Sequence, residues 1–144
     1  MKSQSSKADI VRSLIQNFFN AHDVKVAGTY FTDDFKWYGA SVGHTDGVET
    51  YASTMALFFK ALPDVHATEQ DVITEGNKVV MRFIVEGTHK GDLWGIAATN
   101  NHVKWDALMT YTFVDEKISE QWAIEDWTAI LTAVGEIRPP WLKS

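Results

Sequence analysis

Three side chains of the sequence have the chemistry to move a proton: Glu125, Asp126 and His44. A glutamate buried beside tryptophan rings acquires a raised pKa, which suits a general acid or base, and Trp105 and Trp127 are the expected neighbours of Glu125. A histidine titrates near neutral pH and suits proton transfer too. Each group also has an ordinary explanation: Glu125 as a solvated strand-end residue, Asp126 as a helix N-cap and His44 as an exposed loop residue.

The segment 102–127 is expected to position Glu125. Its side chains alternate on either side of a turn at residues 115–117, which predicts two antiparallel strands with two distinct faces. One face collects aromatic, methionine and amide side chains, and such a largely apolar wall is typical of a small-molecule cavity. The residues expected to line this pocket are Trp37, Tyr38, Phe58, Phe83, Trp94, Trp105, Met109, Tyr111, Gln121 and Ala123.

Parity decides which residues face the pocket. Of the adjacent pair Trp37 and Tyr38, only one can point inward, and Trp37 is favoured. Tyr111, Gln121 or Tyr38 would polarise a ligand carbonyl. Ile118 occupies an alternate position that faces the opposite side of the sheet. Arg82 also faces that side, where it is expected to form a surface or interface ion pair.

The remaining elements must close the pocket. Ser6 is a predicted helix N-cap, and the apolar spacing after residue 47 predicts a helix that Pro63 ends. The expected helices are 7–22, 23–31, 48–62 and 126–134, and the expected strands are 35–40, 65–73, 78–88, 102–114 and 118–126, with loops at 41–47 and 89–101. Helices followed by hairpins indicate an α+β fold.

Length and composition narrow the possibilities. The 144 residues suit one domain, expected at 8–135, with a disordered segment 1–7 before it and a tail 136–144 after it. The net charge is −6 and the basic residues are scattered, so neither nucleic acid nor a membrane is an expected partner. Without cysteine, disulfides and thiolate catalysis are excluded. No metal-ligand or phosphate-loop motif occurs, so no metal or other cofactor is expected. A cytoplasmic location is expected, because the start of the chain lacks the apolar segment of a secretory signal.

Several short motifs occur in a specific order: Leu62-Pro63-Asp64, Glu75-Gly76-Asn77, Gly87-Thr88-His89, Gly95-Ile96 and residues 115–122. In this order and spacing the chain resembles the SnoaL-like polyketide cyclase family of the NTF2-like superfamily, over roughly residues 8–135. The resemblance implies a cone: a curved mixed sheet wrapped around N-terminal helices and an apolar pocket. It also implies a homodimer formed through the sheet.

The resemblance also marks a departure. In the cyclases that the chain resembles, an aspartate after the tryptophan of the last strand is the usual acid–base group, and Ala123 stands at that position here. Met109 faces it, and neither side chain carries a proton. Two functions stay open: a cyclase, isomerase or dehydratase acting on a hydrophobic, polyketide-like carbonyl compound, and a non-catalytic protein that binds a small hydrophobic molecule. A purely structural dimeric scaffold is a third alternative.

Overall fold

The alternating segments of the sequence form one six-stranded sheet in the computed structural model, which describes residues 6–142. The strand order is β2-β1-β6-β5-β4-β3, in which β1 and β6 are parallel and the other neighbours are antiparallel. The strands are β1 (Phe31–Tyr38), β2 (His44–Asp46), β3 (His66–Glu75), β4 (Lys78–Thr88), β5 (His102–Val114) and β6 (Lys117–Glu125).

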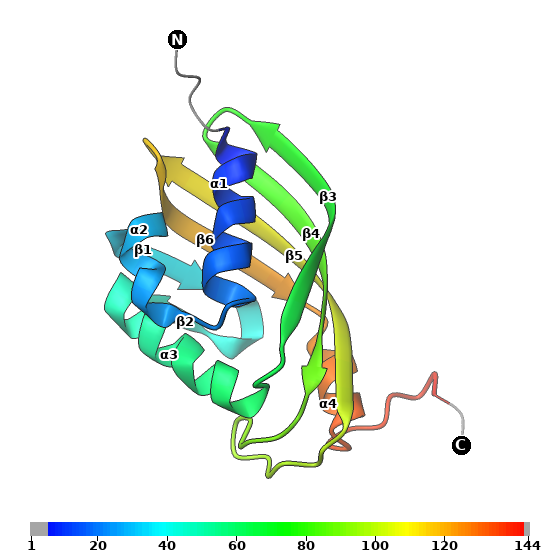
Figure 1. The fold of residues 1–144 in the computed structure, drawn as a ribbon. Helices are drawn as coiled ribbons and strands as arrows, with labels where there is room; N and C mark the ends of the chain where they lie inside the picture. Colours follow the sequence, from blue (N-terminus) through cyan, green and yellow to red (C-terminus); the bar gives the residue numbers. More distant parts are fainter. Residues whose placement is uncertain (1–5, 143–144) are drawn as a thin grey trace.

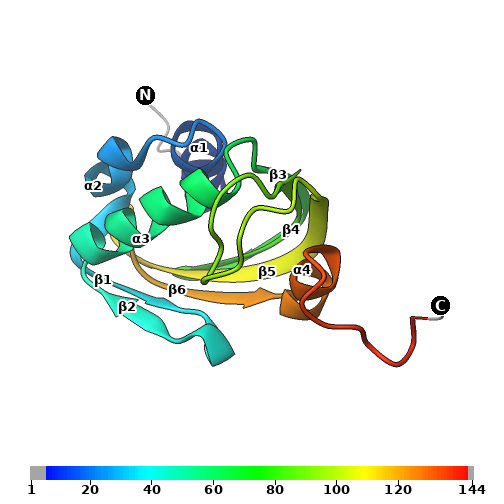
Figure 2. The same ribbon diagram turned by 90° about the horizontal axis from the view of Figure 1, so that it is seen from below.

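Helices cover the concave face of this curved sheet, as Figures 1 and 2 show. They are α1 (Lys7–Leu14), α2 (Ala27–Tyr30), α3 (Val48–Ala61) and α4 (Trp127–Ala133), with a π-helical turn at Ile15–Phe19 and 3₁₀ turns at Val24–Val26 and Ala40–Val42. The predicted α+β fold is therefore confirmed. Within the described part of the chain, no helix is long and apolar enough to cross a bilayer.

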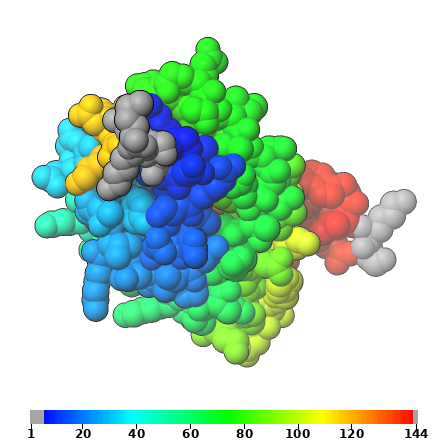
Figure 3. Space-filling view, turned by 45° about the horizontal axis from the view of Figure 1, so that its top comes forward, coloured from blue at the N-terminus to red at the C-terminus, as the bar shows by residue number. Residues whose placement is uncertain are grey.

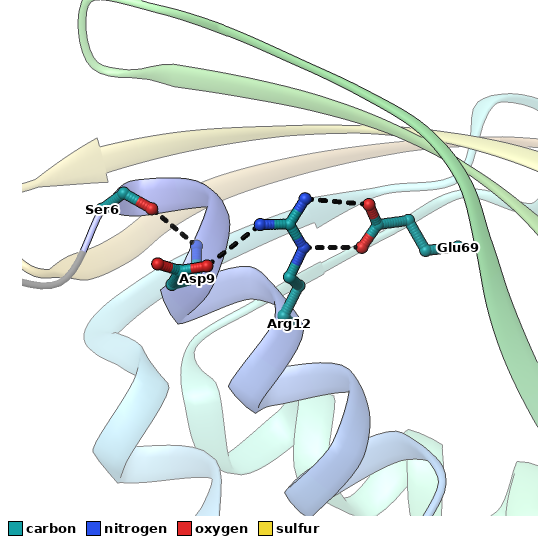
Figure 4. Close-up of polar contacts among 4 residues, drawn as sticks. All are labelled: Ser6, Asp9, Arg12 and Glu69. Atoms are coloured by element: carbon teal, nitrogen blue, oxygen red, sulfur yellow. Dashed lines mark hydrogen bonds and ion pairs between the residues drawn. The ribbon is translucent and has the colours of Figure 1, made fainter.

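An ion-pair network fixes α1 against the edge of the sheet (Figure 4). Ser6 accepts a hydrogen bond from the backbone amide of Asp9, which confirms the predicted N-cap. One turn later, the Arg12 guanidinium donates to both carboxylate oxygens of Glu69 on β3, at 2.8 and 2.9 Å, and also to Asp9. This contact lowers the pKa of Glu69. Ser6 and Lys7 belong to the start of this helix, so they are not part of a disordered segment as predicted. The other residues of that predicted segment, 1–5, lie outside the described residues.

The loop between β4 and β5 is tied to the end of α3. The Asp64 carboxylate accepts hydrogen bonds from the amide and the hydroxyl of Thr88, which lowers the pKa of Asp64. The amides of Lys90 and Gly91 both donate to the carbonyl of Ala61. Figure 2 shows the loop beside α3, over the concave face. The motifs around Asp64 and Thr88 are therefore the packed corner that holds this loop in place.

Three local predictions were wrong. Strand β1 begins at Phe31, not at residue 35, because Phe31 is fully buried and pairs with Ile118 of β6. The segment expected as a loop contains β2, which pairs with the end of β1; three residues are too few to show alternation. Ile118 is buried rather than outward, because a bulge shifts the register between Thr112 and Phe113.

The chain after α4 leaves the body of the protein. Gly135 takes a left-handed backbone conformation, with φ of 81°, and ends the helix. The following segment stands at the edge of the molecule in Figure 3, and Trp141 is 70% exposed.

Candidate functional site

A cavity of about 550 Å³ lies between the concave face of the sheet and the helices. Its walls come from α1 and the π-helical turn, β1, α3, β4, β5 and β6, and the β4–β5 loop and Trp127 close one side. Most of the wall is apolar, as the alternation of β4, β5 and β6 predicts. A volume of this size accommodates a drug-sized ligand.

Glu125 carries the carboxyl group of the inner wall. It pairs with Ala107 of β5 at the end of β6, and its side chain faces the cavity. Its only hydrogen-bond donor among residues 6–142 is the indole nitrogen of Trp105, at 3.0 Å. Loss of hydration raises the pKa of Glu125 from 4.5 to about 7, and the bond from Trp105 opposes this rise. Glu125 can therefore exist in both protonation states near neutral pH.

Two tyrosine side chains face the same cavity. Tyr51 comes from α3 and Tyr111 from β5, and they are 6% and 1% exposed. Burial is the main cause that raises the pKa of both phenols. The negative charge of Glu125 raises both further, so all three groups lie close enough to interact electrostatically. At neutral pH both phenols remain protonated and can donate hydrogen bonds.

The central part of the inner face is formed by Met109 and Gln121. Met109 pairs with Ala123, and Gln121 pairs with Tyr111. The amide nitrogen of Gln121 lies 3.5 Å from the sulfur of Met109, whereas its oxygen is enclosed in the wall without a hydrogen-bond partner among the described residues. Ala123 is fully buried in this face. No proton-transferring group therefore occupies the position of the aspartate expected from the resemblance.

The exposed residues of the wall mark the cavity mouth. Trp94, on the β4–β5 loop, is 52% exposed and packs edge-to-face against Trp127 with ring centroids 5.3 Å apart. Leu57 on α3 is 66% exposed. The exposed residues Lys60 and Asp92 are the charged residues of the mouth. A ligand that enters here passes a charged rim before it reaches the apolar interior.

Seven of the ten predicted pocket residues line the cavity beside Glu125: Trp37, Phe58, Phe83, Trp94, Met109, Tyr111 and Gln121. Trp105 and Ala123 are buried in the same inner face but are not among the residues that line the cavity, and Trp105 donates a hydrogen bond to Glu125, which does line it.

The structure places the other three predicted residues outside the cavity. Tyr38 points to the opposite face of the sheet, since the adjacent Trp37 points inward, and it stacks on Trp122 at 4.5 Å. His44 is exposed on β2, 3.8 Å from Asp46. Asp126 accepts a hydrogen bond from the amide of Ala129 and caps α4. None of the three faces the space occupied by a ligand.

Like Thr54, Lys60 and Asp92, Tyr51 is a polar cavity residue that the sequence did not reveal as a site residue. The helical period of α3 places it on the buried stripe, and its ring is indeed packed against Phe18, Phe31 and Phe35. Tyr51 lines the cavity because α3 lies over the concave face of the sheet. Among the described residues no group of three or more His, Asp or Glu side chains could hold a metal ion.

Comparison with known proteins agrees with this geometry. No curated protein matches the chain. Solved structures with the same fold include a proposed SnoaL-like polyketide cyclase from Jannaschia sp. CCS1, with 21% identity, a TM-score of 0.85 and coverage of 96% of this chain and 100% of that one. IdmH from Streptomyces antibioticus, a proposed polyketide cyclase, has 22% identity, a TM-score of 0.80 and coverage of 91% and 99%.

An NTF2-like protein of unknown function from Cytophaga hutchinsonii has 20% identity, a TM-score of 0.65 and coverage of 88% and 95%. At these identities the structures establish the NTF2-like fold alone. The model of the SnoaL-like polyketide cyclase family matches residues 9–134, nearly the whole predicted domain. The chain therefore belongs to the SnoaL-like polyketide cyclase family.

Proposed function

We propose that this protein catalyses proton transfer on an apolar, polyketide-like molecule that carries a carbonyl group. The observation that carries the proposal is the Glu125 carboxyl group, which lies in the cavity wall with a pKa of about 7. A general acid or base works best when its pKa lies near the working pH. The reaction would be that of a cyclase, an isomerase or a dehydratase.

The common first step needs only residues of this chain. The Glu125 carboxylate takes a proton from the carbon next to the ligand carbonyl, and the electron pair of the broken C–H bond forms an enolate. The Tyr111 hydroxyl donates a hydrogen bond to the enolate oxygen, which stabilises the developing charge. Protonated Glu125 then returns its proton to carbon in an isomerisation, or to a departing oxygen in a dehydration. In a cyclisation, the enolate carbon attacks a second carbonyl of the same molecule, the electron pair of that C=O π bond moves to its oxygen, and the resulting alkoxide takes the proton from Glu125.

Deuterium exchange into α-tetralone tests this step without the natural substrate. The wild type is expected to accelerate exchange at the carbon next to the carbonyl, with a rate that rises as pH increases through about 7. Glu125→Gln should lower this rate by about 10²–10⁴-fold, the usual contribution of general acid–base catalysis. The matched control is Asp126→Asn, which removes the neighbouring carboxylate outside the cavity and keeps a good N-cap. Equal rates for wild type and Glu125→Gln would remove Glu125 from the mechanism.

A non-catalytic binding protein is the second candidate function. The buried Ala123 favours it, because that position holds the acid in the cyclases that the sequence resembles. A binding protein of this kind would take up α-tetralone in calorimetry and leave its exchange rate at that of the solution. The same samples therefore distinguish the two functions.

A further inference from the structure

The hydroxyls of Tyr51 and Tyr111 are donors without a protein acceptor. Both side chains are more than nine-tenths buried and line the cavity, and neither hydroxyl has a hydrogen-bond partner among residues 6–142. Buried polar groups in folded proteins are normally hydrogen-bonded. Tyr30, a buried tyrosine outside the cavity, follows that rule: its hydroxyl lies 2.7 Å from that of Ser13 and accepts from Asn17. In the cavity wall, the oxygen of Gln121 is fully enclosed without a partner, whereas the side chains of Tyr51 and Tyr111 line the cavity and have no partner within the described protein. Their hydroxyls are therefore available to a molecule in the cavity.

Both hydroxyls are held in place by rigid surroundings. The Tyr51 ring stacks on Phe18 and packs edge-to-face against Phe31 and Phe35, with centroids 5.0 to 6.0 Å apart. Tyr111 lies in the middle of the sheet, where it pairs with Val79 on one side and Gln121 on the other. Donors on such elements keep their direction when the ligand changes, which is the condition for electrostatic preorganisation.

The two donors also belong to one cluster. Burial is the main cause that raises the pKa of both; beyond burial, the pKa of Tyr111 is raised by Tyr51 and by Glu125, and that of Tyr51 by Glu125. A carbonyl oxygen has two lone pairs and can accept from two donors at once. Glu125, when ionised, would repel an anionic ligand but can accept a proton from a neutral one.

We propose that Tyr51 and Tyr111 together bind one carbonyl oxygen of the ligand and thereby select neutral ketones and orient them towards Glu125. This inference deepens the proposed function, on which it rests for the use of the cavity as the ligand site. It assigns a ligand-binding role to Tyr51 on α3, and it makes a ketone, rather than an apolar surface alone, the feature that the protein recognises.

The test uses α-tetralone, isotopically labelled at the carbonyl carbon, with tetralin as the analogue that lacks the oxygen. Tyr51→Phe and Tyr111→Phe should each raise the Kd for α-tetralone by about three- to tenfold, the value of one hydrogen bond, and leave the Kd for tetralin unchanged. The infrared stretch of the bound carbonyl should lie at lower wavenumber than in a dry apolar solvent. Each single variant should move the band part of the way back towards its wavenumber in the apolar solvent, and the double variant should move it fully to that value.

Tyr30→Phe is the matched control. It should leave the Kd of both ligands and the infrared band unchanged. It should lower Tm, because it removes the hydrogen bonds to Ser13 and Asn17. The two cavity variants should show the reverse pattern, with Tm unchanged or raised, since they delete hydroxyls without partners. If Tyr51 had only a structural role, Tyr51→Phe would instead lower Tm and weaken the binding of tetralin as much as that of α-tetralone.

An unchanged carbonyl band in Tyr51→Phe would overturn the proposal, as would a wild type that binds tetralin as tightly as α-tetralone or binds neither. Glu125→Gln separates this inference from the proposed function. It should lower the rate of deuterium exchange by about 10²–10⁴-fold and retain the shifted carbonyl band. A shifted band without exchange in the wild type would therefore refute catalysis by Glu125 and leave the tyrosine pair intact.

Discussion

Replacing Glu125 by glutamine is expected to stabilise the protein at alkaline pH and to change little at acidic pH. The carboxyl group sits in the wall of the cavity with one hydrogen bond, from Trp105, and its pKa is raised from 4.5 to about 7. Glutamine keeps the acceptor oxygen for Trp105 and cannot ionise. The stability difference between the two proteins therefore isolates the cost of charge at this position.

The sign and size follow from proton linkage. Below the unfolded pKa of 4.5, both the folded and the unfolded chain carry the proton, and the group makes no difference. Between 4.5 and about 7 the unfolded chain releases its proton first, so the wild type loses stability as pH rises. Above the folded pKa the full cost is present. At 1.36 kcal/mol per pKa unit it amounts to about 3 kcal/mol at pH 8.5, against about 1 kcal/mol or less at pH 5.

The assay is thermal or urea unfolding of both proteins at the two pH values. For a chain of this size, about 3 kcal/mol corresponds to a Tm of Glu125→Gln roughly 6–12 °C above the wild type at the alkaline pH. Glu116→Gln, in the exposed β5–β6 turn, serves as the control and should show no such divergence. A stability difference that stays constant with pH, or a Glu125→Gln protein that is less stable at alkaline pH, would refute the conclusion that loss of hydration raises the pKa of Glu125.

Two further outcomes follow from other parts of the molecule. Asp126→Ala should lower the free energy of unfolding by about 1 kcal/mol, because the amide of Ala129 in α4 loses its cap. Asp126→Asn should retain most of this stability. Equal losses in the two variants would argue against capping. The expected homodimer through the outer face of the sheet would cover Trp122 and Ile124, which are 42% and 52% exposed. Trp122→Glu should then convert a sedimenting dimer into a monomer, and a wild type that already sediments as a monomer would contradict this expectation.

The sequence predicted the inner face of β5 and β6 well, because period-two alternation fixes which side chains share a face. Met109, Tyr111, Gln121 and Glu125 all line the cavity for this reason. The same rule misplaced Ile118, since a bulge reverses parity and leaves no mark in the residue types. The alternation of side chains therefore predicts which face a strand residue occupies only as far as the next β-bulge.

Contacts between distant segments were beyond local patterns. The helical stripe of α3 showed that Tyr51 is buried, but not that it lines the same cavity as Tyr111. For Glu125 the residue types suggested a raised pKa; the single bond from Trp105 depends on the β5–β6 register, in which Ala107 and Glu125 pair. The roles of His44 and Asp126 depended on loop geometry and capping, which the sequence left open.

The parallel pairing of β1 and β6 has a consequence for biosynthesis. Phe31 of β1 has Ile118 as its partner, so the aromatic cluster of β1 cannot be enclosed until residue 118 has been made. At about 5–20 residues per second, the nascent chain waits several seconds for that partner. During this interval the apolar side chains of β1 lack the strand that covers them in the folded protein. Sheet closure between sequence-distant strands is also slow in itself, and we expect it to limit the rate at which the cavity forms.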